Sequence, residues 1–234
     1  RKLFDELKES YGRDVFGQGW LYRIVSPTEI ADVNSLTDDE KLNGIISDRT
    51  FVPYDKGDKD GNRWYAPTPY YIDWNRENVK FLKENSGKKG EGMPVVRNPQ
   101  FYFREGFCWT DVNSTYLKAR IKESGIYDVL TMSLFTKTYL PDILFVCLIN
   151  SSLLSKYVDI FINSTSHFQI NDARQLPIII PNAEQLHVFE NIFNRAVAIQ
   201  KDKFSGKISE PLAEMELDKI QKELDKEVEK LYDL

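Results

Sequence analysis

Cysteine and histidine are scarce in this 234-residue chain, which has two of each. The two cysteines, Cys108 and Cys147, are too few to build the disulfide framework of a small secreted domain. No Cys/His spacing matches a structural zinc site, and no HExxH motif is present. We therefore expect no metal in this chain, and a reducing cytoplasm is the simplest compartment for it.

Long apolar runs are also missing. The longest, around residues 143–149, is too short to span a bilayer, so we expect no membrane partner. No signal peptide is visible, because the charged amino terminus opens with Arg1 rather than Met. We expect from this opening that the chain is an excised piece of a longer protein.

Recognisable catalytic motifs are absent as well. The chain has no P-loop and no GxGxxG. It lacks the Asn-Pro-Pro-aromatic motif of amino-methyltransferases and the Pro-Asp…Glu-x-Lys pattern of nucleases. Ser166, His167 and Asp172 contain the residue types of a hydrolase triad, but such triplets arise by chance in a chain of this length. An enzyme with a diffuse carboxylate site is therefore the least favoured function.

What the chain does have is segregated charge. Residues 49–123, called the basic segment below, carry 14 Lys and Arg against 10 Asp and Glu, whereas the whole chain has a net charge of −5. The same segment holds 14 of the 30 aromatic residues. Positive charge beside aromatic and amide side chains favours contact with nucleic acid, because phosphates supply affinity and side chains reach bases. The alternative is an ordinary surface that keeps the fold soluble.

The apolar pattern predicts a mixed α/β (α+β) fold with a real core. The individual predictions are a helix at 2–10; one or two strands and a helix within 19–46; a β-hairpin at 51–74 with its tip at 57–62; a helix at 75–85; a flexible loop at 86–92; a strand–turn–strand at 100–109; a strand at 131–139; a buried helix at 142–154 that continues to 162; a short helix at 171–176; and a buried strand at 177–181.

The tail predicts an antiparallel helical hairpin. Apolar residues recur at helical spacing in 183–201, and Leu217, Leu224 and Leu231 stand seven apart in 210–231. Two heptads are too few to claim a coiled coil. Within the basic segment, residues 55–62 (DKGDKDGN) have alternating carboxylates like a calcium loop, but Ala66 stands where the twelfth-position Glu belongs, which favours a solvated turn.

Four ordered blocks carry a family resemblance. They are FVPYDKGDKDGNRWY with YYIDW; FYFREGFCWTDVNS followed by ARI; LFVCLINSSLLSKYV with STSHFQINDARQLPIIIP; and ELDKEVEKLYDL. Together they resemble the C-terminal target-recognition region of type IIG restriction–modification methyltransferases and of BREX phage-defence methyltransferases, which share a TaqI-like specificity domain. The chain departs from that pattern at Cys108, where Thr is commoner, and at Asp233, where Gly is usual.

The resemblance implies a sequence-specific domain for double-stranded DNA, without catalysis in this chain. Its fold would be a twisted, largely antiparallel β module with peripheral helices at 1–181, including a linking subregion at 1–48, and the hairpin at 182–234. Adenine methylation, S-adenosylmethionine binding and any nuclease would belong to upstream residues, so we expect no cofactor here and the methyltransferase domain as a partner. The alternative is a protein-interaction module that uses the acidic hairpin.

Residue roles follow from residue type and position. The predicted phosphate contacts are Lys56, Arg63, Lys88, Lys89, Arg97 and Lys118. The predicted contacts to base edges or adjoining phosphates are Arg104, Thr110, Asn113, Ser114 and Arg120. We assign Trp64, Trp74, Phe101, Phe103 and Trp109 to the core, because strands bury every second side chain, and Gln169 and Asn171 to a structural loop.

Overall fold

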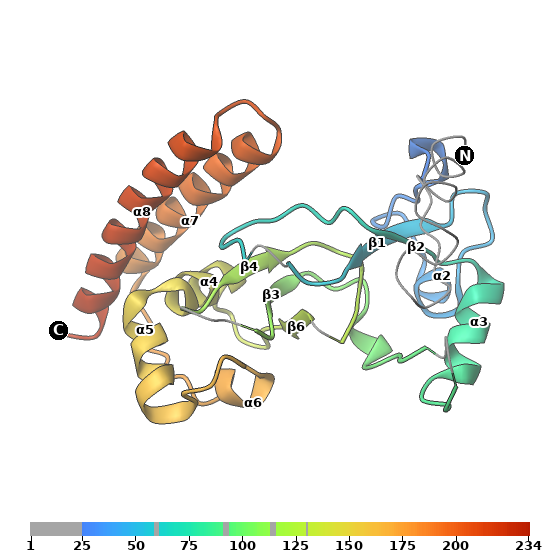
Figure 1. Ribbon diagram of the computed structural model, residues 1–234, viewed down its shortest axis with the longest axis horizontal. Coiled ribbons are helices and arrows are strands. Elements are labelled where there is room, and N and C mark those ends of the chain that lie inside the picture. The colour runs from blue at the N-terminus through green and yellow to red at the C-terminus, as the bar shows by residue number, and fades with distance from the viewer. Residues whose placement is uncertain (1–24, 59–60, 91–93, 113–115, 130) are drawn as a thin grey trace. The chain divides into compact units, whose positions relative to one another are not determined.

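The computed structural model describes residues 25–58, 61–90, 94–112, 116–129 and 131–234 (Figure 1). It has an α+β fold, as predicted. The chain forms two compact units that are interleaved in sequence. Unit 1 takes its described residues from 25–55, Pro69–Phe103 and Ser124–Val129, and unit 2 takes its own from Lys56–Thr68, Arg104–Glu123 and Leu130–Leu234. The predicted division after residue 181 stays a prediction.

Unit 1 is built on a small mixed sheet in the order β2-β1-β5. Strand β1 pairs antiparallel with β2 and parallel with β5. Its core includes Val52, Trp74, Val79, Phe103 and Ile126, each at most 8% exposed. The elements of this unit are η1 (Pro27–Glu29), α2 (Asp38–Asn43), β1 (Phe51–Asp55), β2 (Tyr71–Asp73), α3 (Arg76–Asn85), η2 (Pro99–Phe101) and β5 (Ile126–Tyr127).

Local signals fix the ends of the helices in unit 1. Thr37 and Glu40 form a capping box at the start of α2, and Asn75 caps α3. Gly44 ends α2 at a φ of 97°, and a Cβ there would lie 2.7 Å from the backbone of Arg76. Only glycine fits this close approach, which lets the end of α2 meet the start of α3.

Unit 2 contains an antiparallel sheet in the order β4-β3-β6. Its strands are β3 (Gly106–Thr110), β4 (Ala119–Lys122) and β6 (Thr131–Leu134). Trp64 bridges to the outer edge of β4: its N–H donates to Ala119 O at 2.9 Å, and Ile121 N–H donates to its O at 3.1 Å. The pairing predicted within 51–74 is confirmed, because β1 pairs antiparallel with β2, but the described residues 56–58 and 61–68 between these strands belong to unit 2 and do not form a short hairpin tip.

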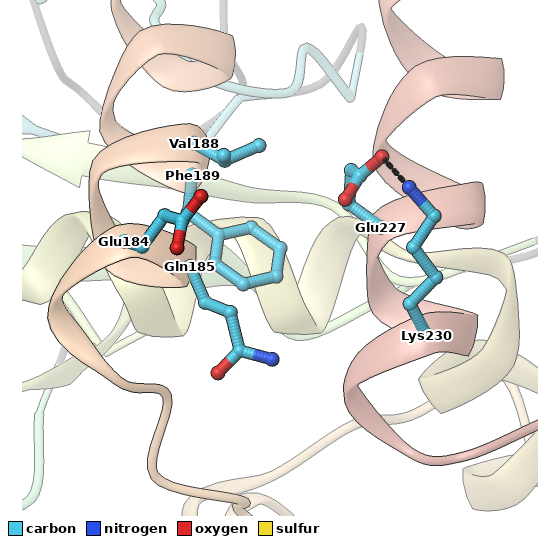
Figure 2. A pocket seen from close by; sticks show the side chains of 6 residues that line it. All are labelled: Glu184, Gln185, Val188, Phe189, Glu227 and Lys230. Carbon is cyan, nitrogen blue, oxygen red and sulfur yellow. Dashed lines mark hydrogen bonds and ion pairs between the residues drawn. The ribbon is translucent and has the colours of Figure 1, made fainter.

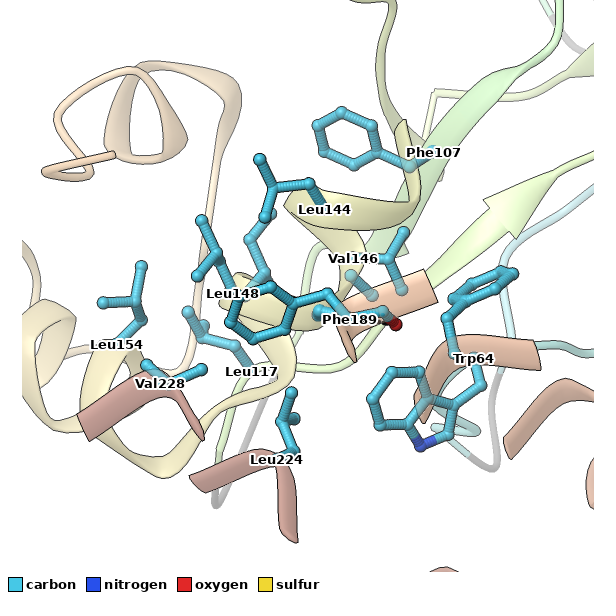
Figure 3. Packing of buried hydrophobic residues seen from close by; sticks show 14 of the residues in the cluster. Trp64, Phe107, Leu117, Leu144, Val146, Leu148, Leu154, Phe189, Leu224 and Val228 are labelled. Carbon is cyan, nitrogen blue, oxygen red and sulfur yellow. Dashed lines mark hydrogen bonds between the residues drawn. The ribbon is translucent and has the colours of Figure 1, made fainter. Parts of the chain in front are cut away.

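The helices described in unit 2 all contribute side chains to one core, and α4 (Asp142–Asn150) is the most deeply buried of them. The others are α5 (Ser152–Tyr157), the π-helix η3 (Val158–Ile162), α6 (Ile170–Ala173), α7 (Ala183–Phe204) and α8 (Glu210–Leu231). Leu144, Val146 and Leu148 on α4 are fully buried among side chains from the sheet and from α7 and α8 (Figure 3). Fully burying each such side chain contributes about 1.5–3 kcal/mol.

The predicted helix at 142–162 is broken. Ser151 ends α4 and caps α5, because its Oγ donates to Leu148 O at 2.7 Å and accepts from Leu154 N–H at 3.2 Å. The axes on the two sides of this break differ by 65°. Among the described residues no single helix is long and apolar enough to cross a membrane; this bent pair meets the criterion only when its two parts are taken together.

The predicted C-terminal hairpin is confirmed. Helices α7 and α8 run antiparallel (Figure 1), and each is 22 residues long. Phe189, Ile192 and Ala196 on α7 and Leu224 and Val228 on α8 are at most 1% exposed. The core assignment of Trp64, Trp74, Phe103 and Trp109 is also confirmed, whereas Phe101 is half-buried.

Two of the strand predictions were wrong. The strand–turn–strand at 100–109 is a 3-10 turn followed by a single strand that begins at Gly106, because Phe103 adopts a φ of 59° that interrupts extended backbone. Residues 177–181 form no strand, and Ile180 is 60% exposed. The strand at 131–139 ends at Leu134. The predicted helix at 2–10 and the start of the 19–46 region lie outside the described residues.

Candidate nucleic-acid interface

The predicted DNA contacts fall into both units. Lys88, Lys89 and Arg97 belong to unit 1, and Lys56, Arg63, Arg104, Thr110, Lys118 and Arg120 belong to unit 2. Asn113 and Ser114 lie outside the described residues. The basic segment is therefore not a single continuous element, and its cations must be judged within each unit.

In unit 1 the cations lie on a loop that follows α3, within its described residues 86–90 and 94–97. Lys88, Lys89 and Arg97 are all exposed. The ends of the loop are tied together, because Gly87 N–H donates to Pro94 O at 3.0 Å and Val96 N–H donates to Ser86 Oγ at 3.0 Å. The loop contains a single acidic residue, Glu91. The described part of this loop therefore presents three exposed cations to solvent, and hydrogen bonds join its two ends.

In unit 2 two of the predicted cations are used by the fold. The Arg63 guanidinium donates to Gln221 Oε1 and to Asn150 O, and its Cζ lies 4.3 Å from the centre of the Tyr116 ring. Arg120 on β4 is only 4% exposed. Arg120 is buried, and Arg63 is half-buried and held by partners within the unit, so a contact of either with DNA stays a prediction.

Thr110 is also engaged within unit 2. Its Oγ1 accepts from Asp58 N–H at 3.0 Å and donates to Asp58 O at 3.2 Å, which anchors the turn after β1. The Asp58 carboxylate in turn accepts from Asn62 Nδ2 at 3.0 Å. Lys56 and Lys118 are half-buried and Arg104 is exposed. Arg104 is therefore the best-exposed predicted cation of this unit.

A polar groove in unit 2 was not predicted from the sequence. It has a volume of ≈ 530 Å³ and lies between the segment at Tyr116, the α5–η3 helices and residues 163–166. We call it the hydroxyl groove, because its lining includes the hydroxyl groups of Ser152, Ser155, Ser164, Thr165 and Ser166. One cation, Lys156, and one carboxylate, Asp159, complete its charged lining.

Side-chain hydrogen bonds hold the loop that forms one wall of this groove. Asn163 Oδ1 accepts from Thr165 N–H at 2.9 Å and from Thr165 Oγ1 at 2.7 Å. Asn163 Nδ2 donates to His167 O at 2.8 Å. His167 Nδ1 lies 2.8 Å from an Asp111 carboxylate oxygen, which links the loop to the residues after β3. The wall is thus pre-formed.

A second groove lies between α7 and α8 (Figure 2). It is smaller, at ≈ 170 Å³, and Figure 2 shows Glu184 and Phe189 on α7 facing it, with Glu227 and Lys230 on α8. The Lys230 ammonium is paired with Glu227 at 2.6 Å. This hairpin groove has a net negative lining, which disfavours phosphate, so of these two grooves the hydroxyl groove is better suited to an anionic ligand.

No conventional catalytic constellation is visible in the described residues. None of their His, Cys, Asp and Glu side chains form a cluster of three or more that would hold a metal ion. Burial raises the pKa of the Cys147 thiol, which keeps it protonated and poorly nucleophilic.

Comparison with known proteins gives one distant relative. No family model matches the chain. The adenine-specific methyltransferase BrxX of Escherichia coli O9:H4 (strain HS) is 26% identical over 143 residues, which cover 59% of this chain. The aligned part is only 11% of that protein. This is a weak similarity to a methyltransferase, and most of the relative's length has no counterpart here.

Proposed function

We propose that this chain is the DNA-recognition region of an adenine-specific methyltransferase. The observation that carries the proposal is the similarity to a small part of an adenine-specific methyltransferase. A region that matches 11% of such a protein leaves ample length elsewhere for methyl transfer and S-adenosylmethionine binding. The chain itself would hold duplex DNA while the catalytic region acts on the base.

The physical demands of adenine methylation support this division. An adenine inside a duplex is inaccessible to an enzyme until it leaves the base stack, so a second region must hold the flanking DNA. Holding a duplex requires cations that reach phosphates. The exposed side chains Lys88, Lys89, Arg97 and Arg104 fit this role by their exposure and charge.

The test is duplex binding by the 234-residue chain, measured by fluorescence anisotropy over a range of salt concentrations. Binding should weaken as salt rises, because phosphate contacts release counterions. Lys88→Glu/Lys89→Glu should weaken binding at low salt by about tenfold or more and lower the slope of log affinity against log salt by about 1.8, the value of two phosphate contacts.

A matched control variant is available on α8. Lys222→Glu/Lys226→Glu makes the same charge change at two exposed lysines of the acidic hairpin. It should leave DNA affinity within about twofold, since net charge alone acts only through weak, screened long-range fields. Equal losses in the two double variants, or no binding by the wild-type chain at low salt, would contradict the proposal.

The negative hairpin groove favours one other function, a protein-interaction module. Val188 and Phe189 provide an apolar floor there, and Glu184 and Glu227 provide acidic rims. If this were the main activity, reversing a charge on the acidic rim by Glu184→Lys would lose a protein partner, while the Lys88/Lys89 variant would behave as wild type. Glu184→Lys and the Lys88/Lys89 variant together therefore decide between the two functions.

A further inference from the structure

We propose that the hydroxyl groove binds the sugar–phosphate backbone of one DNA strand. The inference rests on the proposed function and adds a site that lies outside the predicted DNA-contacting residues. The groove combines a cation, several hydroxyl donors and an exposed aromatic ring in one pre-formed cavity. A phosphodiester beside a sugar is the ligand that uses all three kinds of group.

The side chains that would donate hydrogen bonds to the phosphate have no partner among the other described residues. Lys156 is exposed on α5, and its ammonium makes no hydrogen bond or ion pair with any other described residue. Ser164 and Ser166 are exposed, and their hydroxyl groups likewise have no hydrogen-bond partner among the described residues. Donors without internal partners can bind a ligand at no cost in lost internal bonds.

The scaffold behind these donors is fixed. Ser155 Oγ accepts from Leu117 N–H at 3.0 Å, and Ser152 Oγ donates to Asp225 at 2.7 Å. The hydrogen bonds of Asn163 described above hold the loop that carries Ser164. Because the walls are set before the ligand arrives, binding loses little conformational entropy.

Charge around the groove favours an anion. Arg63 and Lys118 lie 4.3 Å and 5.4 Å from the centre of the Tyr116 ring, which lines the groove and is 43% exposed. Within the lining Lys156 balances Asp159, and Arg63 and Lys118 beside the Tyr116 ring add positive charge next to the groove. The groove volume of ≈ 530 Å³ falls in the range of nucleotide-sized ligands. Its open form suits a continuous strand better than an enclosed small molecule.

Opposite charge changes in the groove give the first test. Lys156→Gln should weaken duplex binding and lower the slope of log affinity against log salt by about 0.9, the value of one phosphate contact. Asp159→Asn should strengthen binding by a few-fold, because it removes the repulsion between a carboxylate and a phosphate. Lys226→Gln and Asp218→Asn on α8 repeat the same chemistry at exposed positions and should change affinity less than twofold.

Cross-linking gives the second test. Cys108 and Cys147 are completely buried, so Ser164→Cys adds an exposed thiol to a chain whose own cysteines are shielded. A duplex carrying a thiol tether on a backbone phosphate should form a disulfide with this variant at least tenfold faster than with Ser209→Cys, an exposed serine before α8.

The outcomes separate the two proposals. If the wild-type chain fails to bind duplex DNA at low salt, both the proposed function and the groove proposal are overturned. If it binds DNA but Lys156→Gln and Asp159→Asn match their α8 controls and Ser164→Cys cross-links no faster than Ser209→Cys, the groove proposal alone is overturned. Adenosine monophosphate binding as tightly as the duplex would also overturn it, since the groove would then be a free-nucleotide pocket.

Discussion

The two units use positive charge in different ways. In unit 1, Lys88, Lys89 and Arg97 lie exposed on a loop. In unit 2, Arg120 is buried on β4, and Arg63 is engaged with α4, with α8 and with an aromatic ring. All five belong to the same basic segment of the sequence. Composition therefore identified where cations gather along the chain but not which of them are exposed to solvent.

The difference has an energetic side. A buried polar group must keep its partners, since an unsatisfied one costs about 1–3 kcal/mol, whereas an exposed lysine is hydrated whether or not it has a partner. Substitutions at the buried polar network of unit 2 should thus change the free energy of unfolding. Substitutions on the loop of unit 1 should change ligand binding instead.

The largest expected effect is at Asn150, which is 1% exposed. Its side chain accepts from Ala119 N–H at 2.7 Å and donates to Ala119 O at 2.9 Å, which holds α4 against the edge of β4. Asn150→Ala leaves the buried Ala119 N–H without its acceptor and opens a small cavity, so it should lower the free energy of unfolding by about 3 kcal/mol. Urea denaturation would measure this; a loss below about 1 kcal/mol would show that the bonds are dispensable.

A smaller effect is expected at Arg63. Arg63→Met keeps much of the aliphatic volume but removes the hydrogen bonds to Asn150 O and Gln221 Oε1, so unfolding should become easier by about 2 kcal/mol. The matched change in unit 1, Lys89→Met, should alter stability by less than about 0.5 kcal/mol because this side chain is exposed. If Arg63→Met and Lys89→Met lowered the free energy of unfolding equally, the cations of the two units would not differ in their contribution to stability.

The smallest expected effect is on how the free energy of unfolding depends on pH. Burial raises the pKa of the Cys147 thiol, and its Sγ lies 3.5 Å from Phe189 O. In the unfolded chain this thiol ionises near its ordinary pKa, so the unfolded state gains stability above about pH 9 while the folded state does not. The free energy of unfolding should fall there by about 1 kcal/mol per pH unit from this group. Cys147→Val removes the thiol, and its unfolding free energy should fall less steeply over the same range.

Features with local causes were predictable. The repeat of Leu217, Leu224 and Leu231 gave the hairpin, and the helix at 75–85 follows from its Asn75 cap and apolar spacing. Strands were harder, because pairing depends on distant partners: Phe103 turns the backbone before β3 begins, and the apolar residues 177–181 find no strand to pair with. The break at Ser151 depends on a hydroxyl that bonds to both flanking turns.

The candidate site was less predictable than the fold. The hydroxyl groove joins residues from three separated segments, 116–117, 152–159 and 163–166, and each segment looks like an ordinary polar stretch. The clusters at Ser151–Ser152 and Ser164–Ser166 were the only sequence signal, and hydroxyl pairs are common in helix caps and turns. Nor could sequence reveal that Arg63 and Arg120 are engaged, because their partners come from contacts across unit 2.

The interleaving of the units limits how this chain can be made and rebuilt. Strand β1 pairs with β5, which lies more than seventy positions later, and residues 56–68 and Arg104–Glu123 go to unit 2 in between. During synthesis unit 1 cannot close its sheet until Ile126–Tyr127 has left the ribosome. For the same reason no single cut yields either unit intact. A chimaera that transplants one unit into another scaffold would have to move three separate stretches of sequence together.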